Sequence, residues 1–162
     1  MTAAEYNLCV DQFSDGIFRF ILKNLRDRDR AQDVVQETFE KLWVKVNSVP
    51  FEKAKSYLFT AAYHTMIDFI RKDKRLETGH DLSRKETSGY QMSSPDLKKL
   101  LEEALNRLPE IQRSVILLRD YEGYAYDEIG QITGLNESQV KVYIYRARLA
   151  LKQFIGSLDA VV

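Results

Sequence analysis

The segment VKVYIYRARLAL, residues 140–151, is compatible with two different secondary structures. From 140 to 145, valine and isoleucine alternate with lysine and tyrosine, which is the period of a half-buried strand. The apolar residues of this stretch also recur at helical spacing, at Val140, Ile144, Ala147, Leu151 and Phe154. The segment alone is therefore compatible with a strand or with an amphipathic helix. The flanking residues are needed to distinguish the two.

The residues before this segment favour the helix. The pattern YDEIGQITG, residues 126–134, predicts a helix of about two turns that ends at Gly134. A new helix begins after it, because Asn136 is a good N-cap and Gln139 lies three positions further on, as in a capping box. The following apolar stripe is too long for an average strand, and no partner strand is evident nearby. The sequence thus predicts a helix-turn-helix, packed through Ile129, Ile132, Leu135, Val140 and Ile144.

The second helix of this motif has an outward face that suits the major groove of DNA. A recognition helix needs donors for base edges and phosphates, together with apolar groups for thymine methyls. The outward positions supply both kinds: Ser138, Gln139, Lys141, Val142, Tyr145, Arg146 and Leu149. The alternative is a solvated face with a few stray apolar residues, but the preceding turn favours DNA contact.

The distribution of charge supports two separate basic regions rather than a basic protein. The chain has 162 residues, of which 44% are hydrophobic and 30% charged, and its formal net charge is zero. Residues 52–75 contain six basic and three acidic residues, and residues 136–152 contain four basic and one acidic residue. A nucleic acid would therefore meet local basic surfaces rather than a global positive field.

The sequence predicts no metal site, cofactor or membrane insertion. Cys9 is the only cysteine, which excludes a disulfide within the chain and a cysteine-rich zinc site. His64 and Asp68 are spaced to share a metal on a helix, but no third ligand, P-loop or Ser-His-Asp set is evident. No signal peptide is apparent, and no stretch approaches the roughly 18 apolar residues of a membrane span. We therefore expect a cytoplasmic protein that is not an enzyme.

The periodicity predicts an all-α chain with two small helical domains on a flexible linker. Residues 1–75 form the first domain, with predicted helices at about 3–25, 31–46 and 53–75. Residues 76–93 are polar and form the linker, which would span roughly 25 Å as a random coil and about 60 Å when extended. Residues 94–162 form the second domain. It begins with Ser94 as an N-cap and Pro95 at the first helical position, and it has a further helix over 109–123 before the helix-turn-helix.

The third helix of the first domain has an outer face that combines aromatic, hydroxyl and basic side chains. Aromatic rings stack on single-stranded bases at about 1–3 kcal/mol each, and basic side chains hold the phosphate backbone. The residues concerned are Lys53, Lys55, Tyr57, Thr60, Tyr63, His64, Ile67, Arg71 and Lys74. A solvated helix face is the alternative, although solvation does not account for Ile67. The face is typical of a surface that holds single-stranded DNA.

The second helix has an acidic stripe opposite its apolar one. The stripe contains Asp29, Asp33, Gln36, Glu37 and Glu40. It would repel DNA and therefore indicates a basic protein partner, the alternative being a solvated charged face.

Three quoted segments carry a resemblance to a known family. DRDRAQDVVQETFEKLW, residues 27–43, and AKSYLFTAAYHTMIDFIRKDKR, residues 54–75, closely resemble region 2 of the extracytoplasmic-function (ECF) RNA polymerase sigma factors. The segment from LEEALNRLPEIQRSV to YRARLALK, residues 101–152, resembles their region 4. The resemblance implies a promoter-specificity factor that binds core RNA polymerase, recognises two promoter elements and opens the duplex without catalysis of its own.

The resemblance also implies partners and roles. Docking on the clamp helices of the polymerase β′ subunit is assigned to Asp33, Gln36, Glu37, Glu40 and Trp43. The second domain is expected to contact the β flap, and an anti-sigma protein is an expected partner. The linker would thread through polymerase near the RNA exit path.

Two DNA contacts follow from the same resemblance. The segment Val49 to Arg71 matches the part of the family that recognises and melts the minus-10 element, and the loop at about 47–55 matches the part that captures a flipped base. Reading of the minus-35 element is assigned to Ser138, Gln139, Lys141, Val142, Tyr145, Arg146 and Arg148.

The chain departs from the family pattern at four of these positions. Tyr57 replaces the usual tryptophan, His64 replaces asparagine, and Val142 and Tyr143 replace a small residue and an arginine. The promoter preference of other members therefore does not transfer. A plain helix-turn-helix regulator is the second hypothesis, but it would not need both the acidic stripe and the aromatic face.

Overall fold

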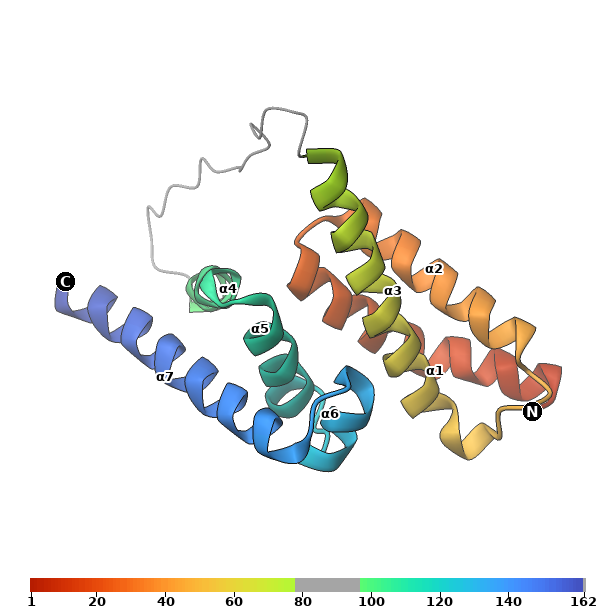
Figure 1. The fold of residues 1–162 in the computed structure, drawn as a ribbon. Coiled ribbons are helices and arrows are strands. Elements are labelled where there is room, and N and C mark those ends of the chain that lie inside the picture. Colours follow the sequence, from red (N-terminus) through yellow and green to blue (C-terminus); the bar gives the residue numbers. More distant parts are fainter. Residues whose placement is uncertain (78–96, 162) are drawn as a thin grey trace.

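Every element that the structure describes is helical, as predicted. The computed structural model describes residues 1–77 and 97–161, so most of the predicted linker and the proposed cap at Ser94 and Pro95 lie outside the described residues. The elements of the first domain are α1 (Ala3–Leu25), α2 (Arg28–Val44), η1 (Phe51–Lys53) and α3 (Ala54–Glu77). Those of the second are α4 (Leu97–Arg107), α5 (Glu110–Ile116), η2 (Leu117–Tyr121), α6 (Tyr126–Thr133) and α7 (Glu137–Val161) (Figure 1).

The first domain is a bundle in which α1, α2 and α3 all contact one another. A capping box starts α1, since the Thr2 hydroxyl accepts from the Glu5 amide at 3.1 Å and the Glu5 carboxylate accepts from the Thr2 amide at 2.8 Å. The apolar stripes bury Ile17, Leu42 and Leu58 completely. α3 runs to Glu77, two residues into the predicted linker.

The second domain contains the predicted helix-turn-helix, formed by α6 and α7 (Figure 1). Gly134 ends α6 in the left-handed region with φ 83°. Asn136 and Gln139 exchange backbone-to-side-chain hydrogen bonds of 2.8 and 2.9 Å, so the capping box at the start of α7 is confirmed. The ambiguous segment lies within α7, where Val140, Ile144 and Ala147 are buried and Val142 is 44% exposed, which confirms the helical and not the alternating pattern.

The two domains pack directly against each other, which the interpretation as tethered modules did not predict. α3 contacts α6, and α1 contacts α4 and α5 (Figure 1). At the centre of this interdomain interface, Phe59 of α3 and Tyr124 of the loop before α6 are 1% and 5% exposed, with ring centroids 5.3 Å apart. Burial of two large rings gives the contact a hydrophobic centre.

Several polar groups around this centre are paired across the interface. Arg113 of α5 donates to the Asn24 carbonyl of α1 at 2.7 Å, and the Ser114 hydroxyl donates to the Asn24 side-chain oxygen at 3.0 Å. Arg19 and Glu122 form a two-bonded ion pair at 3.1 and 3.2 Å. Because unpaired buried polar groups are costly, these matched donors and acceptors favour this arrangement of the domains.

Candidate nucleic-acid interface

The outward face of α7 is exposed along its first turns. Tyr145 is 67% exposed, and Val142 and Leu149 are also accessible. The predicted minus-35 contacts are all exposed: Ser138, Gln139, Lys141, Val142, Tyr145, Arg146 and Arg148. This face therefore offers apolar and donor groups together, as a recognition helix requires.

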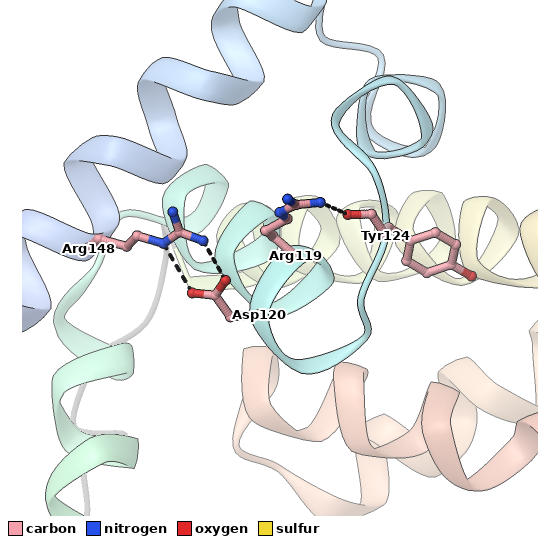
Figure 2. Close-up of polar contacts among 4 residues, drawn as sticks. All are labelled: Arg119, Asp120, Tyr124 and Arg148. Atoms are coloured by element: carbon pink, nitrogen blue, oxygen red, sulfur yellow. Dashed lines mark hydrogen bonds and ion pairs between the residues drawn. The ribbon is translucent and has the colours of Figure 1, made fainter.

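Two of its cations are already engaged within the domain. Arg148 forms a two-bonded ion pair with Asp120 at 2.6 and 3.2 Å (Figure 2), and this hydrogen bonding raises the pKa of Arg148. Lys141 pairs with Glu137 at 3.1 Å. The Arg146 guanidinium instead lies 5.9 Å from the Tyr143 ring centroid. Arg146 is thus the cation of this face that we expect to contact DNA most directly.

The loop before α6 is held in place by Arg119. Its guanidinium donates to the Tyr124 carbonyl at 2.9 Å (Figure 2) and lies 4.4 Å from the Tyr126 ring centroid. The side chain of Tyr124 then enters the interdomain interface, where burial raises the pKa of its hydroxyl well above the ordinary value. That hydroxyl is buried and has no hydrogen-bond partner among the described residues.

The outer face of α3 is mostly accessible but not entirely. Lys53, Lys55, His64, Arg71 and Lys74 are exposed. Tyr57, Thr60 and Ile67 are half-buried.

The outward placement of Tyr63 is wrong, because this residue is only 7% exposed. The second domain packs along this side of α3, where the Lys55 ammonium lies 5.2 Å from the Tyr124 ring centroid. Burial, followed by the nearby Glu110 carboxylate of α5, raises the pKa of Tyr63. One edge of the predicted minus-10 surface is therefore covered by the second domain.

The acidic stripe lies on the exposed face of α2. Asp33, Gln36 and Glu40 are exposed, and Glu37 pairs with Lys41 at 3.4 Å. Trp43 at the end of the stripe is 51% exposed, and its ring lies 5.0 Å from Tyr6. The stripe thus combines carboxylates with an accessible indole, which is a composition suited to a protein partner.

The residues of the interdomain interface were missed by the sequence interpretation. Phe59 lies on the border between the inner and outer faces of α3, and Tyr124 belongs to none of the predicted surfaces. The one available signal was the cluster of tyrosines in YEGYAYD, residues 121–127, because large rings next to a glycine turn often serve in packing.

Residues 1–77 and 97–161 contain neither a candidate metal site nor a helix able to span a membrane. No group of three or more His, Cys, Asp and Glu side chains lies there in a position to hold a metal ion. Within the same residues, no helix is long and apolar enough to cross a membrane.

Comparison with known proteins identifies the family to which the chain is related. The family model for sigma-70 region 2 matches residues 9–76, and the model for sigma-70 region 4 matches residues 98–151. RNA polymerase sigma factor SigV of Bacillus subtilis is 32% identical over 145 residues, covering 86% of this chain and 84% of the relative. ECF RNA polymerase sigma factor SigM of the same organism is 28% identical, covering 86% and 88%.

The whole chain also resembles a solved structure. The sigma factor RpoE of Bartonella quintana, determined in complex with the anti-sigma factor NepR, has a TM-score of 0.80 at 26% identity and covers 93% of this chain and 96% of its own. A score of this size over both domains indicates a similar arrangement of the two. With a helix-turn-helix, an acidic face on α2 and relatives aligned along most of its length, the chain belongs to the extracytoplasmic-function family of RNA polymerase sigma factors.

Proposed function

We propose that this sigma factor divides promoter recognition among three surfaces. The acidic stripe of α2, with Trp43, binds the β′ clamp helices of core polymerase, and the second domain contacts the β flap. The outer face of α3 holds the melted minus-10 strand, and the outward face of α7 reads the minus-35 element. The exposure of the α7 face directly after a well-formed turn is the observation that supports this proposal most strongly. The protein acts in the cytoplasm and has no catalytic chemistry of its own.

The two DNA surfaces are too close together in this arrangement to act at once. The minus-10 and minus-35 elements are about 25 base pairs apart, or about 85 Å at roughly 3.4 Å per pair. α3, which carries the minus-10 surface, packs against α6, and α6 packs against α7, which carries the minus-35 surface; packed helices have axes only about 8–10 Å apart. We infer that the domains separate when the factor engages polymerase and promoter, which also exposes Tyr63.

A protein partner of the anti-sigma type fits the closed arrangement. The solved sigma factor with the similar arrangement of domains was determined with an anti-sigma factor bound. We propose that a regulatory protein of this kind binds the closed chain and delays its opening.

Run-off transcription tests the function as a whole. Core polymerase is assayed with and without the chain on genomic promoter fragments. We expect specific transcripts that appear only when the chain is present. Tight sequence-specific DNA binding without core enzyme, and no transcripts with it, would favour a plain helix-turn-helix regulator.

The acidic stripe gives a first residue-level prediction. Replacing Asp33 and Glu37 together by alanine should weaken binding to core polymerase by about tenfold or more, because two charges of the docking face are lost. Fluorescence anisotropy with labelled chain and purified core measures the affinity. The matched control replaces Asp11 and Asp15, two exposed carboxylates of α1, by alanine and should bind normally. Equal affinity of both double variants would make the stripe a solvated surface.

Arg146 gives a second prediction, on the minus-35 contact. Arg146→Ala should weaken binding of minus-35 duplex by about 1–3 kcal/mol if the guanidinium reads a base edge. If it contacts a phosphate instead, the slope of log affinity against log salt should fall by about one. Titration of a cognate duplex at several salt concentrations separates the two cases. The control is Lys152→Ala, which removes an exposed cation further along α7. If Arg146→Ala weakens DNA binding no more than this control does, Arg146 has no direct role in the contact.

A further inference from the structure

Tyr126, the first residue of α6, lies where three elements of the second domain meet. Its side chain is half-buried. The Arg119 guanidinium of η2 lies 4.4 Å from its ring centroid, and the Lys141 ammonium of α7 lies 5.5 Å from the same centroid. Tyr126 also helps to raise the pKa of Arg148, after the larger effect of the hydrogen bond between Arg148 and Asp120. One tyrosine of α6 is therefore close to three cations, two of which belong to the outward face of α7.

These cations need compensating groups, because like charges that are close together repel each other. The face of an aromatic ring attracts cations, and Glu137 places a carboxylate 3.1 Å from the Lys141 ammonium. Asp120 does the same for Arg148 at 2.6 Å (Figure 2). Lys141 is thus held by two groups, the ring of Tyr126 and the carboxylate of Glu137.

The position of Lys141 matters for DNA binding because a lysine side chain is long and flexible. Such a side chain loses rotamer entropy when it is fixed against a phosphate. A ring that restricts it beforehand reduces this loss and strengthens the contact. A mobile cation attracts any phosphate, whereas a fixed one favours the phosphate that lies in register with the base contacts.

We propose that Tyr126 is a positioning residue of the minus-35 contact, and that its ring holds Lys141 in place for a phosphate of the promoter. This inference rests on the proposed function, in which the outward face of α7 reads the minus-35 element. The ring acts on Lys141, whereas the hydroxyl acts on Arg148. Substitutions that keep or remove the ring therefore separate the two effects.

Promoter binding by the full chain with core polymerase tests this role. The probes are a promoter fragment found by run-off transcription and a fragment of equal length whose minus-35 element is scrambled. Tyr126→Leu should weaken binding of the promoter fragment about fivefold, because the ring is lost. Binding of the scrambled fragment should not change, because every charge remains. Tyr126→Phe keeps the ring and should bind the promoter fragment within about twofold of the natural chain.

Two further substitutions separate positioning from packing. Tyr121→Leu is the matched control: it removes a ring that is 39% exposed and lies 5.4 Å from the Lys23 ammonium of the first domain, and promoter affinity should stay normal. Lys141→Met removes the cation, so addition of Tyr126→Leu to it should cause no further loss of affinity. If the leucine variant does not fold, Tyr126→Met replaces it, since the flexible methionine fills the same space.

Three results would overturn the positioning role. They are natural promoter affinity in Tyr126→Leu, an equal loss in Tyr121→Leu, and a loss that persists in the Lys141→Met background, where only packing is left to explain it. The natural chain reports on the proposed function separately. If its complex with core polymerase does not prefer the promoter fragment to the scrambled one, the minus-35 function itself is lost. If the preference exists and Tyr126→Leu leaves it unchanged, only the positioning role is lost.

Discussion

Tyr124→Ala should open the free chain. The ring of Tyr124 is 5% exposed and packs on Phe59 at the centre of the interdomain interface. Truncation of a buried aromatic residue typically costs about 3–5 kcal/mol, and here the lost ring contacts Phe59 and Lys55 of the other domain. Small-angle X-ray scattering of the free chain should therefore show a larger radius of gyration for this variant.

Tyr124→Phe is the matched control, and it should act in the opposite direction. The Tyr124 hydroxyl is buried without a hydrogen-bond partner among the described residues, so its removal abolishes a desolvation penalty while the ring remains. We expect the phenylalanine variant to stay compact and to be up to about 1 kcal/mol more stable. If Tyr124→Ala is as compact as Tyr124→Phe, the ring does not hold the domains together.

Gly130→Ala should disrupt the helix-turn-helix. A Cβ at Gly130 would lie 2.7 Å from the Leu135 backbone carbonyl oxygen, and neither backbone can yield without moving α6 relative to α7. Overpacking of this kind costs about 1–3 kcal/mol, and the moved recognition helix should lose most of its minus-35 affinity. Chemical denaturation and duplex titration measure the two effects.

Gly156→Ala is the control for this substitution. Gly156 lies in α7 with no heavy atom within 4 Å of the position of an added Cβ, so alanine should stabilise the helix by about 0.5–1 kcal/mol. DNA binding should remain normal. If the Gly130→Ala chain were as stable as the Gly156→Ala chain and bound minus-35 duplex with the same affinity, the close approach of α6 to the turn would be contradicted.

The helix-turn-helix was predictable because its signals are local. The turn at Gly134 is followed within a few residues by the capping box of Asn136 and Gln139. Once this start of a helix is recognised, the apolar spacing after it excludes a strand. The acidic stripe of α2 followed from helical periodicity for the same reason. Surfaces that depend on one helix alone can be derived from one segment of sequence.

The interdomain interface was not predictable because it depends on long-range contacts. Arg113 and Asn24 are 89 positions apart, and nothing in either segment specifies the other. Helical periodicity predicted Tyr63 on the outer face of α3, because that prediction treated the first domain alone. In the structure, the second domain covers that edge of α3. Similarly, the sequence predicted one continuous helix over 109–123. The structure has a π-helical stretch, η2, whose altered register accompanies the pairing of Asp120 with Arg148.

A reversible cross-link between the domains should block transcription, because the domains have to separate on the promoter. Arg19→Cys and Glu122→Cys place two thiols across the interdomain interface, where the natural side chains meet at 3.1 Å. A bismaleimide with a cleavable disulfide would join them. Cys9 is buried, and burial raises the pKa of its thiol, so it should not react.

Run-off transcription is then compared for the linked chain, the same chain after reduction, and the double variant that was never linked. We expect no specific transcript from the linked chain and full recovery after reduction, because α3 and α7 cannot reach both promoter elements while the domains are closed. Transcription by the linked chain at the level of the unlinked one would contradict this expectation.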